Sequence, residues 1–331
     1  MAVDTTIEAP EVRDRAPWRV RDLVARAWSL NRPLTFLGLA MIAVLAVATA
    51  GLVLDPRVIT GAPAWLKPAK FAISIAIYSF TFVWLLTFVR GYPRLVRALS
   101  WMTVLMLGLE MVVIGGAAAL GTTSHFNVST PAHTVAWSAM ASAIVVTWMA
   151  NLGVGILLLR QRLADRAFLW SLRLGVAVSS VGMGVAFFMT SPTAEQLATA
   201  RASGSLPMAG AHSVGVADGG PGLPVVGWST VGGDLRVAHF VGLHALQVLP
   251  LLGVALSRFG PAWLGARHRV ALVWTAGLSY FGLVALATWQ ALRGQSLVRP
   301  DALTVWTAAT LAVVTVAAIA VTIAHARRRA N

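Results

Sequence analysis

The sequence predicts an all-α integral membrane bundle of about eight transmembrane helices, preceded by an N-terminal amphipathic interfacial helix. Hydrophobic residues make up 57% of the 331 residues and charged residues only 11%. Several apolar runs reach the ~20 residues that a helix needs to cross the hydrocarbon core. The formal net charge is +14, and arginines between these runs supply most of it. Because basic connections are typical of membrane topology, we expect a lipid bilayer rather than nucleic acid as the partner.

The N-terminal segment divides into two predicted parts. Residues 1–14 are polar and acidic, which predicts a disordered cytoplasmic tail. In residues 15–32, apolar side chains such as Leu23 and Trp28 fill one arc of a helical wheel, and charged side chains such as Arg21 fill the other. This pattern predicts an amphipathic helix that lies on the cytoplasmic surface of the membrane.

The transmembrane domain is expected over residues 33–323, followed by a basic cytoplasmic tail at 324–331. Its eight predicted spans are 33–54, 69–89, 99–119, 134–159, 168–190, 234–256, 270–291 and 302–323. With the N-terminus inside, 19 of the 26 basic residues lie on the cytoplasmic side and 7 on the outer side. This asymmetry predicts a multi-pass plasma membrane protein with cytoplasmic N- and C-termini.

One predicted connection is much longer than the others. Residues 191–233 lie on the expected outer side and are rich in glycine. A connection of this length without secondary structure is often a lid or a binding loop. Asp234 follows two glycines at the start of the sixth span, so we predict that it is the N-cap of that helix.

The sixth span carries four polar side chains within an arc of about 140°, at 100° per residue. They are Arg236, His239, His244 and Gln247. Polar groups inside a membrane usually face the bundle interior, so we expect this arc to do so. The five-residue spacing of the imidazoles separates them by about 7.5 Å along the helix axis, and therefore no shared metal site is predicted.

Glu110 is the only acidic residue in the interior of a predicted span, and its expected depth matches that of His244. An ionisable group at this depth costs roughly 2.5–3.5 kcal/mol, so it usually has a function. We therefore predict that Glu110 and His244 form a proton-handling catalytic pair, with a structural ion pair or a protonated acid as the alternative. His125 would lie about 22 Å from Glu110 along a continuous helix, too far for contact.

The second span begins with the only two lysines of the chain, Lys67 and Lys70. Lysine is disfavoured at a helix N-terminus unless an anion is present. Two ammonium groups beside free backbone N–H groups therefore indicate an anion site. The alternative is that both side chains extend to lipid phosphates.

Three functions fit an outward-facing polar site of this composition. The first is binding of an anionic redox cofactor, most simply haem b, by the candidate cofactor-binding residues Lys67, Lys70, His125, Arg236, His239, His244 and Gln247. The second is proton-coupled transport of a small anionic solute. The third is metal-dependent hydrolysis of lipid, with His125, Asp234 and His239 around the metal. No P-loop, nucleophile elbow or metalloprotease motif occurs, so the sequence leaves enzyme, carrier and structural subunit open.

Overall fold

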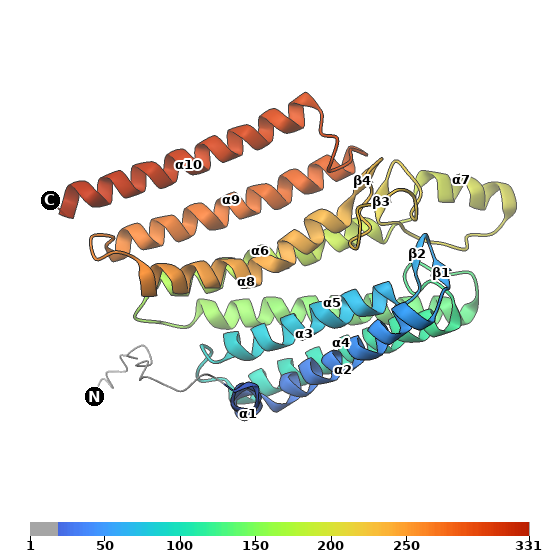
Figure 1. The fold of residues 1–331 in the computed structure, drawn as a ribbon, viewed down its shortest axis with the longest axis horizontal. Helices are drawn as coiled ribbons and strands as arrows, with labels where there is room; N and C mark the ends of the chain where they lie inside the picture. Colours follow the sequence, from blue (N-terminus) through green and yellow to red (C-terminus); the bar gives the residue numbers. More distant parts are fainter. Residues whose placement is uncertain (1–18, 331) are drawn as a thin grey trace.

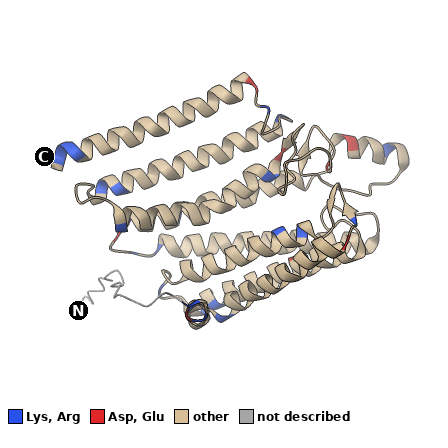
Figure 2. Ribbon diagram, in the orientation of Figure 1, with Lys and Arg blue, Asp and Glu red and all other residues tan. Residues whose placement is uncertain are grey.

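The computed structural model describes residues 19–330 and is all-α, with 73% of its residues in helices. Eight of the described helices are long and apolar enough to cross a membrane, which confirms the predicted number. They run side by side along one direction (Figure 1). Lys and Arg residues gather near the helix ends, and the middle of the bundle is almost free of charge (Figure 2).

The helices overlap the predicted spans closely. The long ones are α2 (Arg32–Leu54), α3 (Leu66–Leu86), α4 (Pro93–Leu120), α5 (Pro131–Leu159), α6 (Arg166–Gly184), α8 (Leu235–Phe259), α9 (Ala266–Leu292) and α10 (Ala302–Ala330). A short helix α1 (Val20–Leu30) precedes them. The predicted 1–14 tail and the first residues of the predicted interfacial helix lie outside the described residues, and the position of α1 on a membrane surface stays a prediction.

The bundle consists of two halves of four helices each (Figure 1). Helices α2–α5 form the first half, and α6, α8, α9 and α10 form the second. Buried leucines of α6 and α8, Leu172 and Leu246, join the apolar core of the first half. Within the second half, α6 and α8 approach most closely at Gly182 and Gly242, where an added Cβ would lie 2.6 Å or less from the opposite backbone.

Both described chain ends lie at one end of the bundle, which we call the terminal end; the other is the site end (Figure 1). At the site end, strand β1 (Val58–Ile59) pairs antiparallel with β2 (Ala62–Pro63) and leads directly into α3. The hairpin turn between them has positive φ at Thr60 and Gly61, as a tight two-residue turn requires.

The long connection at the site end is folded, which differs from the expected structureless loop. After the short 3-10 helix η1 (Val185–Met189) comes α7 (Ala194–Ser203), which has a complete capping box at Thr193 and Gln196. Strand β3 (Ser213–Val214) then pairs antiparallel with β4 (Gly233–Asp234). The connection is therefore attached to the start of α8 by backbone hydrogen bonds.

Candidate functional site

Lys67, in the first turn of α3, donates to an imidazole. Its Nζ lies 3.0 Å from Nδ1 of His125. An ammonium group can only donate, so Nδ1 of His125 is the acceptor and the ring proton is assigned to Nε2. Phe71 and Trp137 enclose the imidazole, with ring centroids 5.7 and 5.6 Å from it.

His125 also contacts Glu110, contrary to the prediction that these two residues are too far apart. The Nε2 of His125 lies 3.6 Å from Oε1 of Glu110. Helix α4 ends at Gly121, which adopts the left-handed conformation, and the following residues return toward the bundle. The predicted distance of about 22 Å assumed a continuous helix, and the reversal at Gly121 removes that assumption.

Glu110 is the most deeply buried member of this group. Its side chain is only 1% exposed, and its second oxygen, Oε2, has no hydrogen-bond partner within residues 19–330. At 3.6 Å the His125 Nε2 is also beyond hydrogen-bond distance of Oε1, so this buried carboxyl group requires a water molecule, a proton or a ligand group to satisfy it. The Lys67–His125–Glu110 chain therefore leads from the partly exposed start of α3 to a polar atom inside the bundle.

A second imidazole at the site end is held by an aspartate. Asp218 accepts from the His212 ring Nδ1 at 2.7 Å and from the backbone N–H groups of His212 and Ser213. Burial opposes ionisation of Asp218, but these hydrogen bonds prevail and lower its pKa. Burial lowers the pKa of His212 despite the aspartate. Asp218 thus fixes the proton on Nδ1 and leaves Nε2 of His212 as an acceptor.

A third imidazole, His239 of α8, is oriented by the close approach of α6 and α8. Its Nδ1 lies 2.8 Å from the carbonyl oxygen of Gly182, to which it donates. Its Nε2 has no hydrogen-bond partner among the described residues.

The imidazoles of His125 and His212 lie near each other, with ring centroids 6.3 Å apart. Burial, followed by the charges of Lys67, His212 and His239, lowers the pKa of His125 well below its ordinary value.

The segment 223–228 is attached to the cations of the site. Lys70 donates to the carbonyl oxygen of Val226 at 3.2 Å, and Arg236 donates to that of Gly227 at 2.6 Å. Arg236 also makes two side-chain hydrogen bonds to Asp234. Asp234 accepts from the backbone N–H of Arg236, which confirms the predicted N-cap. Lys70 and Arg236 therefore bind the same loop at the site end.

The predicted Glu110–His244 pair is not formed. His244 is exposed on α8, whereas Glu110 is buried against His125. Gln247, one turn further along α8, does reach the other half of the bundle, where its Nε2 donates to Thr81 Oγ1 of α3 at 3.1 Å. The arc predicted to face the bundle interior was therefore too wide. His239 and Gln247 contact other helices, whereas His244 is exposed.

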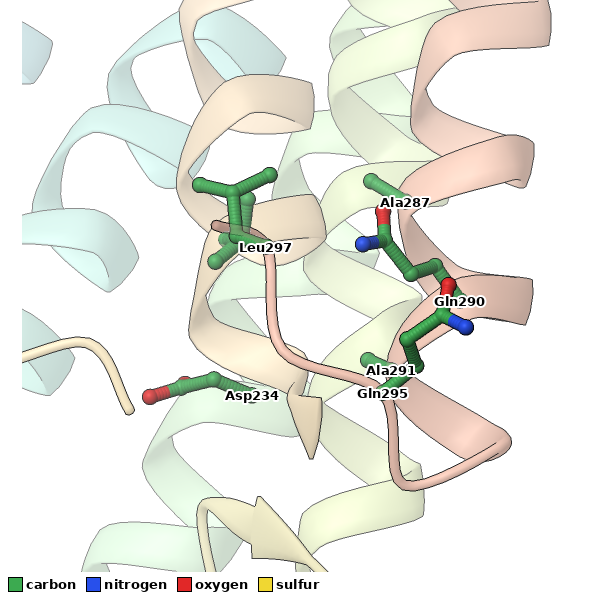
Figure 3. A pocket seen from close by; sticks show the side chains of 7 residues that line it. Asp234, Ala287, Gln290, Ala291, Gln295 and Leu297 are labelled. Carbon is green, nitrogen blue, oxygen red and sulfur yellow. The ribbon is translucent and has the colours of Figure 1, made fainter. Parts of the chain in front are cut away.

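Metal binding and haem binding were two of the functions predicted for this site. Residues 19–330 contain no group of three or more His, Cys, Asp or Glu side chains arranged to hold a metal ion. His125 does not fit as a haem ligand, because both ring nitrogens face other groups. The cavity beside Asp234 (Figure 3), bounded on its other side by Gln290 and Gln295, measures about 10 Å³. That volume accommodates about one water molecule.

Sequence reasoning found Lys67, Lys70, Glu110, His125, Arg236 and His239 but missed the role of His212 and Asp218. The available signal was His212 followed six residues later by Asp218, which stands next to two glycines in a region otherwise poor in charge.

Comparisons with protein-family models, curated proteins and solved structures give no match. The function must therefore be inferred from the geometry of the site.

Proposed function

We propose that this membrane protein is a proton-coupled carrier of a small anion, which binds at the site end beside Lys67 and Lys70. The observation that carries the proposal is the contact chain from the Lys67 ammonium through His125 to the buried Glu110 carboxyl group. In the predicted orientation, this site faces away from the cytoplasm.

The charge balance of the site favours an anion. Arg236 is neutralised by Asp234. Lys67 and Lys70 have no carboxylate within salt-bridge distance, and each ammonium has one hydrogen-bond acceptor in the described residues. An ammonium group has three N–H donors, so both lysines retain donors for a carboxylate or phosphate oxygen. Because the site is partly buried, the attraction is weakened less by salt than at an open surface.

Binding of an anion and of a proton would assist each other. Lys67 disfavours protonation of His125 by its charge and by donating to Nδ1. An anion paired with Lys67 offsets that charge and draws the ammonium away from Nδ1. His125 can then bind a proton and pass one to Glu110. The two ligands therefore increase each other's affinity, which is the linkage that symport requires.

The test is uptake of radiolabelled inorganic phosphate and succinate into proteoliposomes under an imposed pH gradient. We expect gradient-driven uptake by the parent chain and its loss in Glu110→Gln, which keeps the shape of the side chain but cannot ionise. Glu195→Gln is the matched control, because Glu195 lies on α7, away from the contact chain. Failure of the parent chain to carry either anion, or unchanged uptake by Glu110→Gln, would refute the proposal.

Haem b with one axial imidazole is the second candidate. It is favoured by His239, whose Nδ1 donates to the Gly182 carbonyl oxygen and whose Nε2 is left as a potential ligand. When bound, haem would supply electron-transfer chemistry, and Lys67 and Lys70 would face its propionates. An absorption spectrum of the purified protein without a Soret band eliminates this candidate.

The lipid hydrolase remains the third candidate and has less support. Of its predicted metal ligands, Asp234 is fully engaged by Arg236 and the backbone of Ser229. His125 is engaged by Lys67. A metal bound to these residues would require both to exchange partners, and metal analysis of the purified protein tests this directly.

A further inference from the structure

A polar stripe runs along α3 from the site toward the terminal end. At 100° per residue, Lys67, Ser74, Tyr78 and Thr81 fall within about 60° of one another. They span about 21 Å along the helix axis at 1.5 Å per residue. The exposed apolar residues Ile73 and Ile77 lie on the neighbouring side of α3, about 110° and about 70° from the middle of this arc. One face of this helix is therefore polar through most of the membrane.

The two ends of the stripe have known partners. Lys67 contacts His125, which contacts Glu110. Thr81 accepts from Gln247 of α8, in the other half of the bundle. The stripe therefore begins at the candidate site and ends at the junction of the two halves. Between these points lies Tyr78, whose buried hydroxyl group has no partner within the described residues.

Further buried polar atoms at the junction of the two halves also lack hydrogen-bond partners within residues 19–330. They include Gln247 Oε1 on α8, Asn151 Oδ1 on α5 and Ser179 Oγ on α6. Asn151 and Ser179 are fully buried. Asn151 also joins the two halves, because its Nδ2 donates to Ser180 of α6 at 2.9 Å. Buried polar groups of native proteins are nearly always satisfied, so these atoms require water molecules or a passing ligand.

The junction is closed at the terminal end by aromatic side chains from both halves. Trp84 of α3 and Phe88 just after it pack against Phe168 of α6, with ring centroids 5.0–6.0 Å apart. This cluster lies one turn beyond Thr81, where the polar stripe ends. The polar region thus continues from the site end and stops at an apolar barrier.

We propose that the α3–α8 junction, lined by Ser74, Tyr78, Thr81 and Gln247, is the water-filled passage by which the anion and proton leave the site. Its inner closure is the cluster of Trp84, Phe88 and Phe168. This inference rests on the proposed carrier function and adds the route. The route runs between the two halves of the bundle, and alternating access would require these halves to move relative to each other.

Cysteine accessibility tests the route, because the chain contains no native cysteine. Single variants Ser74→Cys and Thr81→Cys are compared with Ile73→Cys and Ile77→Cys in proteoliposomes. The probe is a membrane-impermeant, charged methanethiosulfonate added from the site end. We expect labelling of the stripe positions at least about tenfold faster than of the isoleucine positions, because an apolar surrounding disfavours the reactive thiolate. Added phosphate or succinate should slow labelling of Ser74→Cys.

The outcomes separate the route from the carrier function. Equal labelling at stripe and isoleucine positions, with uptake by the parent chain intact, would overturn the route and leave the carrier proposal standing. Fast labelling of the stripe without anion uptake would support an aqueous passage and refute the carrier proposal. Each substitution is small, and size-exclusion profiles of the purified variants show whether each one folds.

Discussion

The contact between Gly182 of α6 and Gly242 of α8 gives a sharp prediction about stability. A Cβ atom built on Gly182 would lie 2.6 Å from the backbone of Gly242 and 2.8 Å from the amide nitrogen of Leu243. Ordinary contact begins at 3.4 Å, so Gly182→Ala must push the helices apart by about 0.8 Å. Backbone atoms on both sides cannot rotate away, as a flexible side chain could.

Overpacking of this kind costs about 1–3 kcal/mol. The matched control is Gly115→Ala in α4, where an added Cβ meets nothing within 4 Å. That change should stabilise the protein by about 0.5–1 kcal/mol, because glycine is unfavourable inside a helix. The two alanine variants should therefore differ by about 1.5–4 kcal/mol in the free energy of unfolding.

The assay is denaturation of purified protein in detergent micelles, followed by tryptophan fluorescence. Gly182→Ala should also weaken the hydrogen bond from His239 to the Gly182 carbonyl oxygen. Gly242→Ala, which meets Gly182 from the other side at 2.5 Å, should reproduce the loss of stability. Unfolding of Gly182→Ala at the same denaturant concentration as Gly115→Ala would contradict the conclusion that the backbones of α6 and α8 meet at Gly182.

Three further predictions concern the site end. Because the pKa values of His125 and His212 are lowered in the folded protein, the unfolded chain binds more protons below about pH 6.5, so stability should fall as the pH decreases below this value. His212→Gln should flatten this dependence in melting curves recorded at several pH values. Thr193→Ala removes the capping box and should lower the stability of α7 by about 1 kcal/mol. Hydrogen exchange should then become faster in Ala194–Ser203 and not in the other helices. Asp234→Ala leaves Arg236 without its carboxylate partner and should destabilise the fold by about 3 kcal/mol in thermal denaturation.

The sequence predicted the helices well because hydrophobicity determines them directly. A span must satisfy its backbone groups internally and present apolar side chains to lipid, so both its length and its composition are restricted. The α4 helix, Pro93–Leu120, shows this: the apolar run predicted 99–119, and the helix extends it at both ends. N-capping was equally predictable at Asp234, because it depends on neighbouring residues only.

The contacts of the site were less predictable because they depend on loops. The Glu110–His125 contact requires the chain to reverse at Gly121, and the helical wheel contains no information on that reversal. His212 and Asp218 come together through an ordered connection whose folding depends on β3 and β4, which are two residues long each. Strands this short leave almost no periodic pattern in a sequence.

The three imidazoles of the site differ in which ring nitrogen carries the proton. This difference indicates the order in which they would pass a proton in the proposed carrier. Asp218 and the Gly182 carbonyl oxygen hold the protons of His212 and His239 on Nδ1, so each Nε2 can accept a proton from water. Lys67 donates to Nδ1 of His125, so the Nε2 proton of His125 faces Glu110 instead. In the proposed carrier, a proton would therefore enter at His212 or His239 and be passed inward only after Lys67 releases Nδ1 of His125. An anion bound to Lys67 would supply that release, so the same ammonium group would control the binding of both ligands.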